Sequence, residues 1–184
     1  MSALSDAVKS GKALYIGLSN YPKDALEKAI KILKDNGTPP LIYQGHFSMM
    51  DRDLEESGIL ELCKKEGLGV IPFSIFNQGL LTTKYLEGIP KTSRVRDAYN
   101  PHVNEEDLTK PLVKTLNALH RDAQDAGMRS ITDAALHYVL SREGISSTLV
   151  GVRTMAQLEE LHGVLGQEIK ADSLGRLAEM HFQS

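Results

Sequence analysis

The stretch Ala13-Leu-Tyr-Ile-Gly-Leu18 indicates the fold class, because it is a short apolar run that ends at the polar pair Ser19-Asn20. Such a run is typical of a strand buried in a parallel sheet. The residues that follow predict a helix, since Pro22 pre-sets a helical start and apolar side chains recur on one face until Gly37. Strand and helix together make one β/α unit.

The same alternation continues along the chain. Three further strands are predicted at 41–44, 68–74 and 147–150. Helical patterns separate or follow them at about 59–67, 104–127, 130–144, 154–165 and 172–180. The segment 75–103 has no sustained period, and so long a loop in a compact domain usually has a function or is mobile. The pattern predicts an α/β fold with about four parallel strands and their helices.

Length and composition are those of an ordinary globular protein. The chain has 184 residues, of which 41% are hydrophobic and 24% charged, so we expect a single domain spanning residues 1–184. A net charge of -3 with interspersed signs provides no basic face for nucleic acid or a membrane, and neither partner is expected. No apolar run reaches membrane-spanning length, the amino terminus does not resemble a signal peptide, and Cys63 is the single cysteine. A cytoplasmic location is therefore expected.

Candidate ligand-binding residues follow the predicted strands, because ligands of parallel α/β folds sit at the carboxyl ends of the strands. These positions are Ser19-Asn20, Gln44 to His46, Ser74 to Leu81, and Gly151 to Arg153. They supply hydroxyls, amides and a guanidinium without a carboxylate pair, which favours ligand binding over proton chemistry. Gly151 to Arg153 also precedes a helix and predicts an anion site, although a plain surface arginine explains this pattern equally well.

Other residue types that carry chemistry have structural interpretations, which we favour. His46 is a candidate proton donor, but a lone histidine is more often structural. The charge run from Asp51 to Glu56 is more typical of a solvated surface than of a metal site. Cys63 lies in an apolar stripe, which favours a core position over a reactive thiol. The remaining histidines show no shared metal-ligand spacing, so no metal ligand is assigned.

Several spaced motifs, taken in order, resemble the aldo/keto reductase family. They are Gly11-Lys-Ala-Leu-Tyr-Ile-Gly-Leu-Ser-Asn20, Phe73-Ser74 with Gln78-Gly-Leu-Leu81 and Lys84-Tyr85, and Gly151-x-Arg153 with Gln157-Leu158-x-Glu160. The resemblance is to the branch that includes potassium-channel β subunits and glyceraldehyde-3-phosphate reductase-like enzymes, and it covers nearly the whole chain.

The resemblance implies an eight-stranded TIM-type barrel that uses NADPH, with this chain corresponding to strands five through eight. It assigns the nicotinamide carboxamide to Ser19, Asn20 and Gln44. It assigns the ring and pyrophosphate to Phe73, Ser74, Ile75, Phe76, Asn77, Gln78, Leu80, Lys84 and Arg94, and the 2′-phosphate and adenine to Gly151, Arg153, Gln157 and Glu160. Where the family usually has Ser-Pro-Leu after the third of these strands, this chain has Ser74-Ile75-Phe76.

The family's Asp, Tyr, Lys and His tetrad belongs to its first four strands, so the resemblance assigns no catalytic residue here. We expect the cofactor-binding portion of an NADPH-dependent aldo/keto reductase acting on a carbonyl or alcohol, inactive by itself and most simply a fragment. The alternative is a noncatalytic nucleotide-binding or interaction protein. The expected partner of the reductase portion is a missing amino-terminal half, and that of the noncatalytic alternative is a second copy in a half-barrel dimer that covers the open sheet edges.

Overall fold

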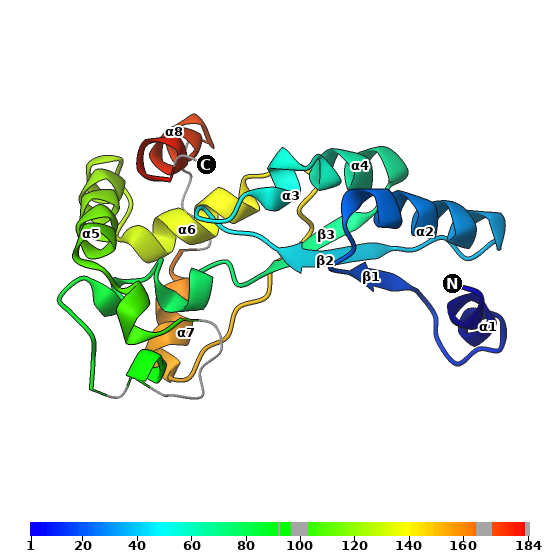
Figure 1. Ribbon diagram of the computed structural model, residues 1–184, viewed down its shortest axis with the longest axis horizontal. Coiled ribbons are helices and arrows are strands. Elements are labelled where there is room, and N and C mark those ends of the chain that lie inside the picture. The colour runs from blue at the N-terminus through cyan, green and yellow to red at the C-terminus, as the bar shows by residue number, and fades with distance from the viewer. Residues whose placement is uncertain (92, 97–102, 165–170, 183–184) are drawn as a thin grey trace. The chain divides into compact units, whose positions relative to one another are not determined.

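The computed structural model describes residues 1–91, 93–96, 103–164 and 171–182 (Figure 1). The chain forms two compact units. The sheet unit comprises Met1–Phe47, Asp51–Phe73 and Leu140–Val150, and the helical unit comprises Ser48–Met50, Ser74–Val139 and Gly151–Ser184. Among the described residues, no helix is both long and apolar enough to span a bilayer.

The centre of the sheet unit is a parallel sheet of three strands in the order β1-β2-β3. These are β1 (Gly17–Ser19), β2 (Ile42–His46) and β3 (Gly69–Phe73). The register aligns Leu18 with Tyr43 and Tyr43 with Val70. The parallel α/β fold class expected from the sequence is thereby confirmed, and each of the first three predicted strands overlaps an observed one.

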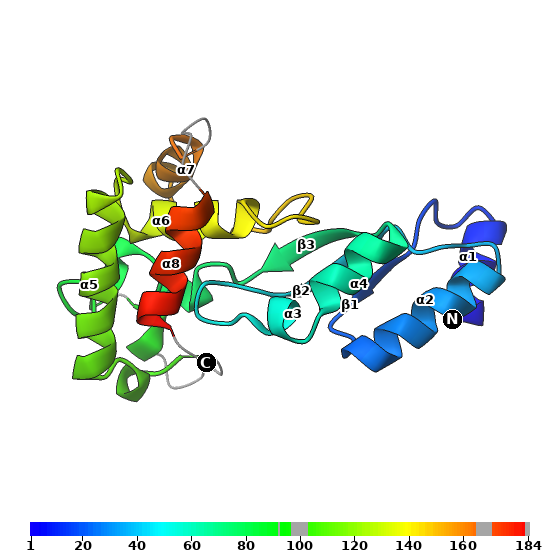
Figure 2. The ribbon, with the colours of Figure 1, turned by 90° about the horizontal axis from the view of Figure 1, so that it is seen from above.

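Helices cover one face of this sheet. Side chains alternate along β2 and β3, so that Tyr43 and Val70 are buried while Ile42 and Ile71 on the opposite face are only partly covered. Helices α2 (Lys23–Asp35) and α4 (Ile59–Glu66) lie on the same side of the strands (Figures 1 and 2). Their apolar stripes are buried as the sequence predicts: Leu26, Ala29, Ile30 and Leu33 in α2, and Ile59, Leu60, Leu62 and Cys63 in α4.

Two short helices of the sheet unit were not predicted. They are α1 (Ser2–Lys9) and α3 (Asp53–Glu56). Within α3 a single side chain, Leu54, is buried, and the surrounding charges conceal that short amphipathic turn from a search for periodicity. Ser5 of α1 is buried and its hydroxyl lies 2.7 Å from that of Thr38, so a polar contact holds α1 in place.

The fourth predicted strand, 147–150, is wrong as a regular strand. The segment lies beside β3, where Val70 N donates to Gly144 O and Ser146 N donates to Val70 O, giving one bridge between Val70 and Ile145. The next residue of β3 that faces this segment is Pro72, which has no amide hydrogen to donate. The ladder then slips, since Leu149 N rather than the amide of residue 148 donates to Pro72 O. Pro72 therefore ends regular pairing at this edge.

The helical unit begins with a long segment of single turns, as the lack of periodicity predicts. It contains the 3-10 turns η1 (Asn77–Gly79), η2 (Thr83–Tyr85) and η3 (Arg94–Arg96). A small core of Leu80, Tyr85, Val95 and Val103 holds the described part together. The Tyr85 hydroxyl is 2.9 Å from that of Ser93, which gives this buried phenol a polar partner.

The first long helix of this unit, α5 (Lys110–Asp125), starts later than predicted. The sequence places its start at Asn104, but Asn104 instead caps the separate turn η4 (Glu105–Asp107). Leu108 then leaves the helical region with ψ at 58°, and Thr109 caps α5 by accepting a bond from Leu112 N. Pro111 in the first turn explains the later start, because proline is tolerated there but not in a helix interior.

Three more helices complete the helical unit. They are α6 (Ile131–Leu140), of which Leu140 belongs to the sheet unit, α7 (Met155–His162) and α8 (Ala171–His181). Helix α8 lies against α5, and His181 Nε2 is 2.6 Å from the Asp122 carboxylate. All three predicted helices are confirmed, although residue 165, the predicted end of α7, lies outside the described residues.

Candidate functional site

Three residues assigned to the nicotinamide lie together at the carboxyl end of the sheet. Ser19 ends β1 and is aligned with Gln44 of β2. The backbone amide of Asn20 donates to Gln44 O at 3.0 Å. Ser19 and Asn20 are exposed and Gln44 is half-buried, so their hydroxyl and amide groups are accessible to a ligand. Strand alternation turns Gln44 to the face opposite Tyr43 and the helices.

The backbone at several of the assigned residues is left-handed. Asn20, Ser74, Asn77 and Gln78 have φ angles of 58°, 56°, 43° and 58°, and they are the non-glycine residues with positive φ within the described ranges. Asparagine enters this conformation comparatively easily, whereas serine and glutamine adopt it at a cost of about 1 kcal/mol or more. All four belong to the set that the family resemblance assigns to the cofactor. Strain of this kind persists where surrounding structure fixes it, and it gathers at binding sites.

Hydrogen bonds hold the strained loop that follows β3. Asn77 N donates to Ser74 O at 2.7 Å, and Gln78 Nε2 donates to the Ser74 hydroxyl at 3.4 Å. Ile75 and Leu80 are buried, so their side chains form core and are not accessible to a ligand. Phe76 is partly exposed, as is Phe73, which belongs to the sheet unit. Ile75 stands where the family usually has a proline. It therefore places a buried apolar side chain at the position of a rigid turn residue.

Two cations were assigned to the pyrophosphate. Lys84 is exposed, but its ammonium donates to the Tyr85 hydroxyl at 2.8 Å and lies 4.7 Å from the centre of that ring. These contacts orient the ammonium while leaving it donors for an anion. Arg94 belongs to η3, and its side chain lies outside what the structure describes.

The start of α7 carries the residues assigned to the 2′-phosphate and adenine. Thr154 caps the helix by accepting a bond from Gln157 N, and Gln157 Oε1 accepts a bond from Arg153 N at 2.8 Å. The Gln157 oxygen is therefore engaged at the start of the helix, close to the pattern of a capping box. The Arg153 guanidinium is exposed and bonds to no other residue in the described parts of the chain. Gly151 is also exposed.

The Arg129 side chain holds the backbone of Glu160, a contact that the sequence did not predict. Arg129 Nε and Nη2 donate to the fully buried Asp133 carboxylate at 2.7 and 3.0 Å, and Nη2 also donates to Glu160 O at 3.0 Å. A side chain at Gly163 would come within 2.6 Å of Arg129 Nη1. The i, i+4 spacing of Arg129 and Asp133 was a signal for the pair, but not for its burial.

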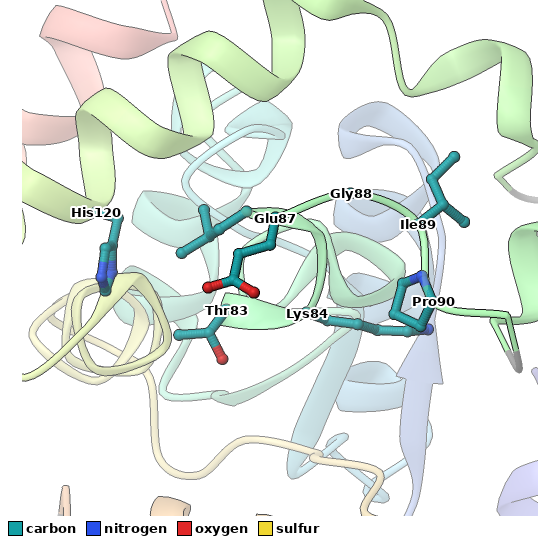
Figure 3. A pocket seen from close by; sticks show the side chains of 8 residues that line it. Thr83, Lys84, Glu87, Gly88, Ile89, Pro90 and His120 are labelled. Atoms are coloured by element: carbon teal, nitrogen blue, oxygen red, sulfur yellow. The ribbon is translucent and has the colours of Figure 1, made fainter.

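A pocket of about 440 Å³ lies beside η2 in the helical unit (Figure 3). Its wall combines charged, apolar and imidazole groups from Thr83, Lys84, Leu86, Glu87, Gly88, Ile89, Pro90 and His120. Lys84 is the one residue of the predicted cofactor set in this wall. His120 Nδ1 accepts a hydrogen bond from the backbone amide of Ile131. In the neutral ring the proton is therefore on Nε2.

His46 has a structural partner, as the favoured interpretation requires. Its Nδ1 is 2.7 Å from the Asp51 carboxylate, and its ring meets Phe73 edge-on with centroids 5.4 Å apart. The rest of the charge run is also engaged, because Arg52 Nε lies 3.3 Å from Glu55 and 3.8 Å from Glu56. His102 lies outside the described residues.

Cys63 is a core residue, as predicted. Its side chain is fully buried, and burial raises the pKa of the thiol to about 11. The thiolate that would react with an electrophile is therefore scarce at neutral pH.

Comparison of the sequence with known proteins identifies the family of this chain. The sequence model of the aldo/keto reductase family matches residues 1–181. The chain is 38% identical over 161 residues to the L-glyceraldehyde 3-phosphate reductase of Escherichia coli O157:H7, covering 86% of this chain and 46% of that protein. It is 32% identical over 160 residues to norsolorinic acid reductase B of Dothistroma septosporum, covering 86% of this chain and 39% of the relative. The chain thus spans about half the length of the curated relatives it matches.

A solved structure shows the same fold. The crystal structure of a thermostable aldo-keto reductase, Tm1743, with the inhibitor epalrestat superposes with a TM-score of 0.68 at 22% sequence identity. The match covers 97% of this chain and 53% of the other. The parallel sheet with its helices therefore has the fold of part of a β/α barrel.

Proposed function

Because the chain belongs to the aldo/keto reductase family, we propose that it carries the NADP(H)-binding portion of an oxidoreductase that acts on an aldehyde, a ketone or an alcohol. Both relatives compared above are reductases by name. The chain covers 46% of the first and 39% of the second, so the proposal for the chain itself is cofactor binding. A single buried cysteine agrees with a cytosolic location, which we include in the proposal.

The left-handed backbone at Asn20, Ser74, Asn77 and Gln78 is the observation that carries this proposal. The same four residues are among those that the family motifs assign to the cofactor. The loop after β3 also carries the polar side chains of Ser74, Asn77 and Gln78, none of them fully buried, which suits a ligand with several donors and acceptors.

The residues fit the parts of a dinucleotide. Ser19 and Gln44 lie side by side and offer a hydroxyl and an amide, the groups that match the donor and acceptor of a nicotinamide carboxamide. Arg153 offers an exposed guanidinium next to the first amides of α7, which suits a phosphate. We propose that Arg153 binds the 2′-phosphate and thereby favours NADP(H) over NAD(H).

No residue of this chain is proposed as the proton donor. A bound dihydronicotinamide supplies a hydride to a carbonyl carbon, and the carbonyl oxygen then needs a proton from a nearby acid. His46 is held by Asp51 and Phe73, and we assign it to the structure of the β2 end. The chain alone is therefore expected to bind cofactor without turnover.

The test is a titration of the purified chain with NADPH and with NADH, followed by nicotinamide fluorescence. Removing a charge-assisted contact should weaken NADPH binding by roughly tenfold or more in Arg153→Ala, with little change for NADH. Arg121→Ala is the matched control, since Arg121 is also exposed. Equal losses for the two nucleotides would refute the 2′-phosphate role.

Two further outcomes decide the rest of the proposal. Failure of the unaltered chain to bind either nucleotide would overturn cofactor binding. Reduction of a simple aldehyde by the chain alone would show that it holds a proton donor that we have not assigned.

A further inference from the structure

The Arg129 side chain, just before α6, contacts two parts of the helical unit at once. Its Nε and Nη2 atoms donate to the Asp133 carboxylate at 2.7 and 3.0 Å, and Nη2 also donates to Glu160 O at 3.0 Å. Asp133 lies in the first turn of α6, and Glu160 lies in the last turn of α7. One guanidinium therefore joins the start of α6 to the end of α7.

The guanidinium is held in a fixed orientation on the α6 side. The Asp133 carboxylate is fully buried, and besides its two bonds from the guanidinium it accepts the backbone amide of Arg129 at 3.2 Å. The backbone amide of Asp133 donates to the Ser130 hydroxyl at 3.4 Å. A bidentate pair fixes the plane of a guanidinium more strictly than a single bond does. The third bond of the guanidinium, to Glu160 O, is therefore directed at α7 by a rigid support.

Gly163 gives a second, independent observation of this contact. It is the C-cap of α7 and has a φ angle of -67°, so its backbone conformation does not require glycine. A β-carbon added here would lie 2.6 Å from Arg129 Nη1 and 3.4 Å from Glu159 O. The lack of a side chain at residue 163 thus makes room for the guanidinium beside the last turn of α7.

The carbonyl of Glu160 is a suitable place for a cation. Carbonyls in the last turn of a helix lack intrahelical donors and carry partial negative charge. Gly163 N donates to Glu159 O and Val164 N donates to Leu161 O, so among the described residues the guanidinium supplies the donor for Glu160 O. The side chains of Leu161 and Val164 are also buried at this end. Helix α7 is therefore anchored at its carboxyl end.

The opposite end of α7 carries the groups proposed for the 2′-phosphate. Thr154 caps the helix, and the exposed Arg153 precedes its first amides. The eight residues of α7 span about 12 Å, and a helix this short depends on tertiary contacts for its stability. Because a helix moves as one body, a contact that fixes its last turn also fixes the position of Arg153.

We propose that Arg129, oriented by Asp133, is a positioning residue for the 2′-phosphate site, because it holds α7 where Arg153 can meet that phosphate. This inference rests on the proposed binding of NADP(H). Neither Arg129 nor Asp133 contacts the nucleotide in it, so the pair contributes to cofactor preference only through α7.

A variant that keeps stability but removes the anchor separates positioning from folding. Arg129→Met with Asp133→Leu replaces the whole pair by apolar side chains, which retains most of the stability. The variant nevertheless lacks the donor for Glu160 O. We expect its NADPH affinity to fall by roughly fivefold to tenfold, with little change for NADH, in the nicotinamide-fluorescence titration. Arg142→Met is the matched control, because it breaks the 2.6 Å pair with Glu55 in the sheet unit and should leave the preference unchanged.

Two double-mutant cycles test the route of the effect. In an Arg153→Ala background, Arg129→Met with Asp133→Leu should change the ratio of NADPH to NADH affinity by less than about twofold, because the residue that transmits the effect is gone. Gly163→Ala crowds Arg129 Nη1 and should lower NADPH affinity in the otherwise unaltered chain. The same substitution should have no effect once Arg129 is replaced by Met.

Amide hydrogen exchange of the chain without nucleotide tests the anchor itself. Leu158 N donates to Thr154 O and Gly163 N donates to Glu159 O, so both amides report on α7. Exchange at these two amides should be about tenfold faster in Arg129→Met with Asp133→Leu, while exchange in α5 stays unchanged.

Failure of this inference differs from failure of the proposed function. If Arg153→Ala lowers the NADPH preference but Arg129→Met with Asp133→Leu does not, the positioning role is wrong and the proposed function stands. An undiminished effect in the Arg153→Ala background, equal losses for NADPH and NADH, or unaltered exchange in α7 would each overturn the positioning role as well. A chain that binds neither nucleotide overturns both.

Discussion

The sheet unit and the helical unit are stabilised in different ways. In the sheet unit, regular strands and the apolar stripes of α2 and α4 bury one continuous face, and described ion pairs such as Lys34 with Glu66 lie at the surface. In the helical unit, a buried carboxylate at Asp133 and a buried phenol at Tyr85 depend on specific polar partners. Periodic packing tolerates change in single contacts, whereas a buried polar group depends on each partner.

The largest expected effect comes from breaking the charge pair of the helical unit. Arg129→Ala leaves the Asp133 carboxylate buried without its cation, and we expect a loss of about 3 kcal/mol in the free energy of unfolding. Urea unfolding followed by circular dichroism measures this loss. Replacing both residues by apolar side chains, Arg129→Met with Asp133→Leu, should recover most of it.

The sheet-unit counterpart is Lys34→Ala, which removes an exposed ion pair with Glu66. Its expected loss is about 0.5 kcal/mol, because solvent screens surface pairs. If both single substitutions have the same effect, the contrast drawn between the two units is wrong.

A smaller effect concerns the strained loop of the helical unit. Gln78→Gly removes the steric cost of a residue at φ 58° and should raise the free energy of unfolding by roughly 0.5 kcal/mol. It should also weaken NADPH binding, because it removes a side chain that the family resemblance assigns to the cofactor. In α5, where the backbone is right-handed, Gln124→Gly should instead lower stability by about 1 kcal/mol. Thermal unfolding of the two variants distinguishes these signs. Destabilisation by Gln78→Gly would show that its bond to Ser74 outweighs the strain.

The smallest effect is a pH dependence from His137 in α6. Burial lowers the pKa of this imidazole below its ordinary value of 6.5, Asp133 partly opposes that shift, and Arg129 adds to it. The folded state therefore disfavours the protonated ring, while the unfolded chain accepts the proton near the ordinary value. Stability is full above pH 6.5 and falls as the pH drops through the lowered pKa.

Unfolding midpoints measured from neutral to mildly acidic pH should show this dependence, and His137→Leu should reduce its slope. His162→Ala is the control, because His162 is exposed at the end of α7 and should leave the slope unchanged. An unaltered slope in His137→Leu would assign the pH dependence to other groups.

Elements with a simple period were predictable from the sequence. The apolar spacing of Leu26, Ile30 and Leu33 placed α2, and short runs between turn residues placed the first three strands. The sequence predictions were wrong where one residue interrupts a pattern. Pro72 ends the pairing of the predicted fourth strand, and Pro111 moves the start of α5. A proline is visible in the sequence, but which hydrogen bond it removes depends on its neighbours in space.

For the candidate site, the sequence showed which residue types follow each strand but not how they are held. The pairing of Ser19 with Gln44 follows from two parallel strands ending together, so it was predictable. The left-handed angles of Asn77 and Gln78 and the contact of Arg129 with Glu160 O were not. Each depends on a partner that is distant in sequence or on a local geometry without a periodic signal.

The sequence by itself determined the parallel α/β class, the apolar faces of the helices, the burial of Cys63 and the family to which the chain belongs. These follow from periodicity and from ordered motifs, which are local properties of the chain. Tertiary structure alone decided that Asp133 is fully buried and that Ile145 is bridged to Val70 in the row of Leu18 and Tyr43. The physical reason is that burial and register are set by which distant segments pack together, and no residue encodes its distant neighbours.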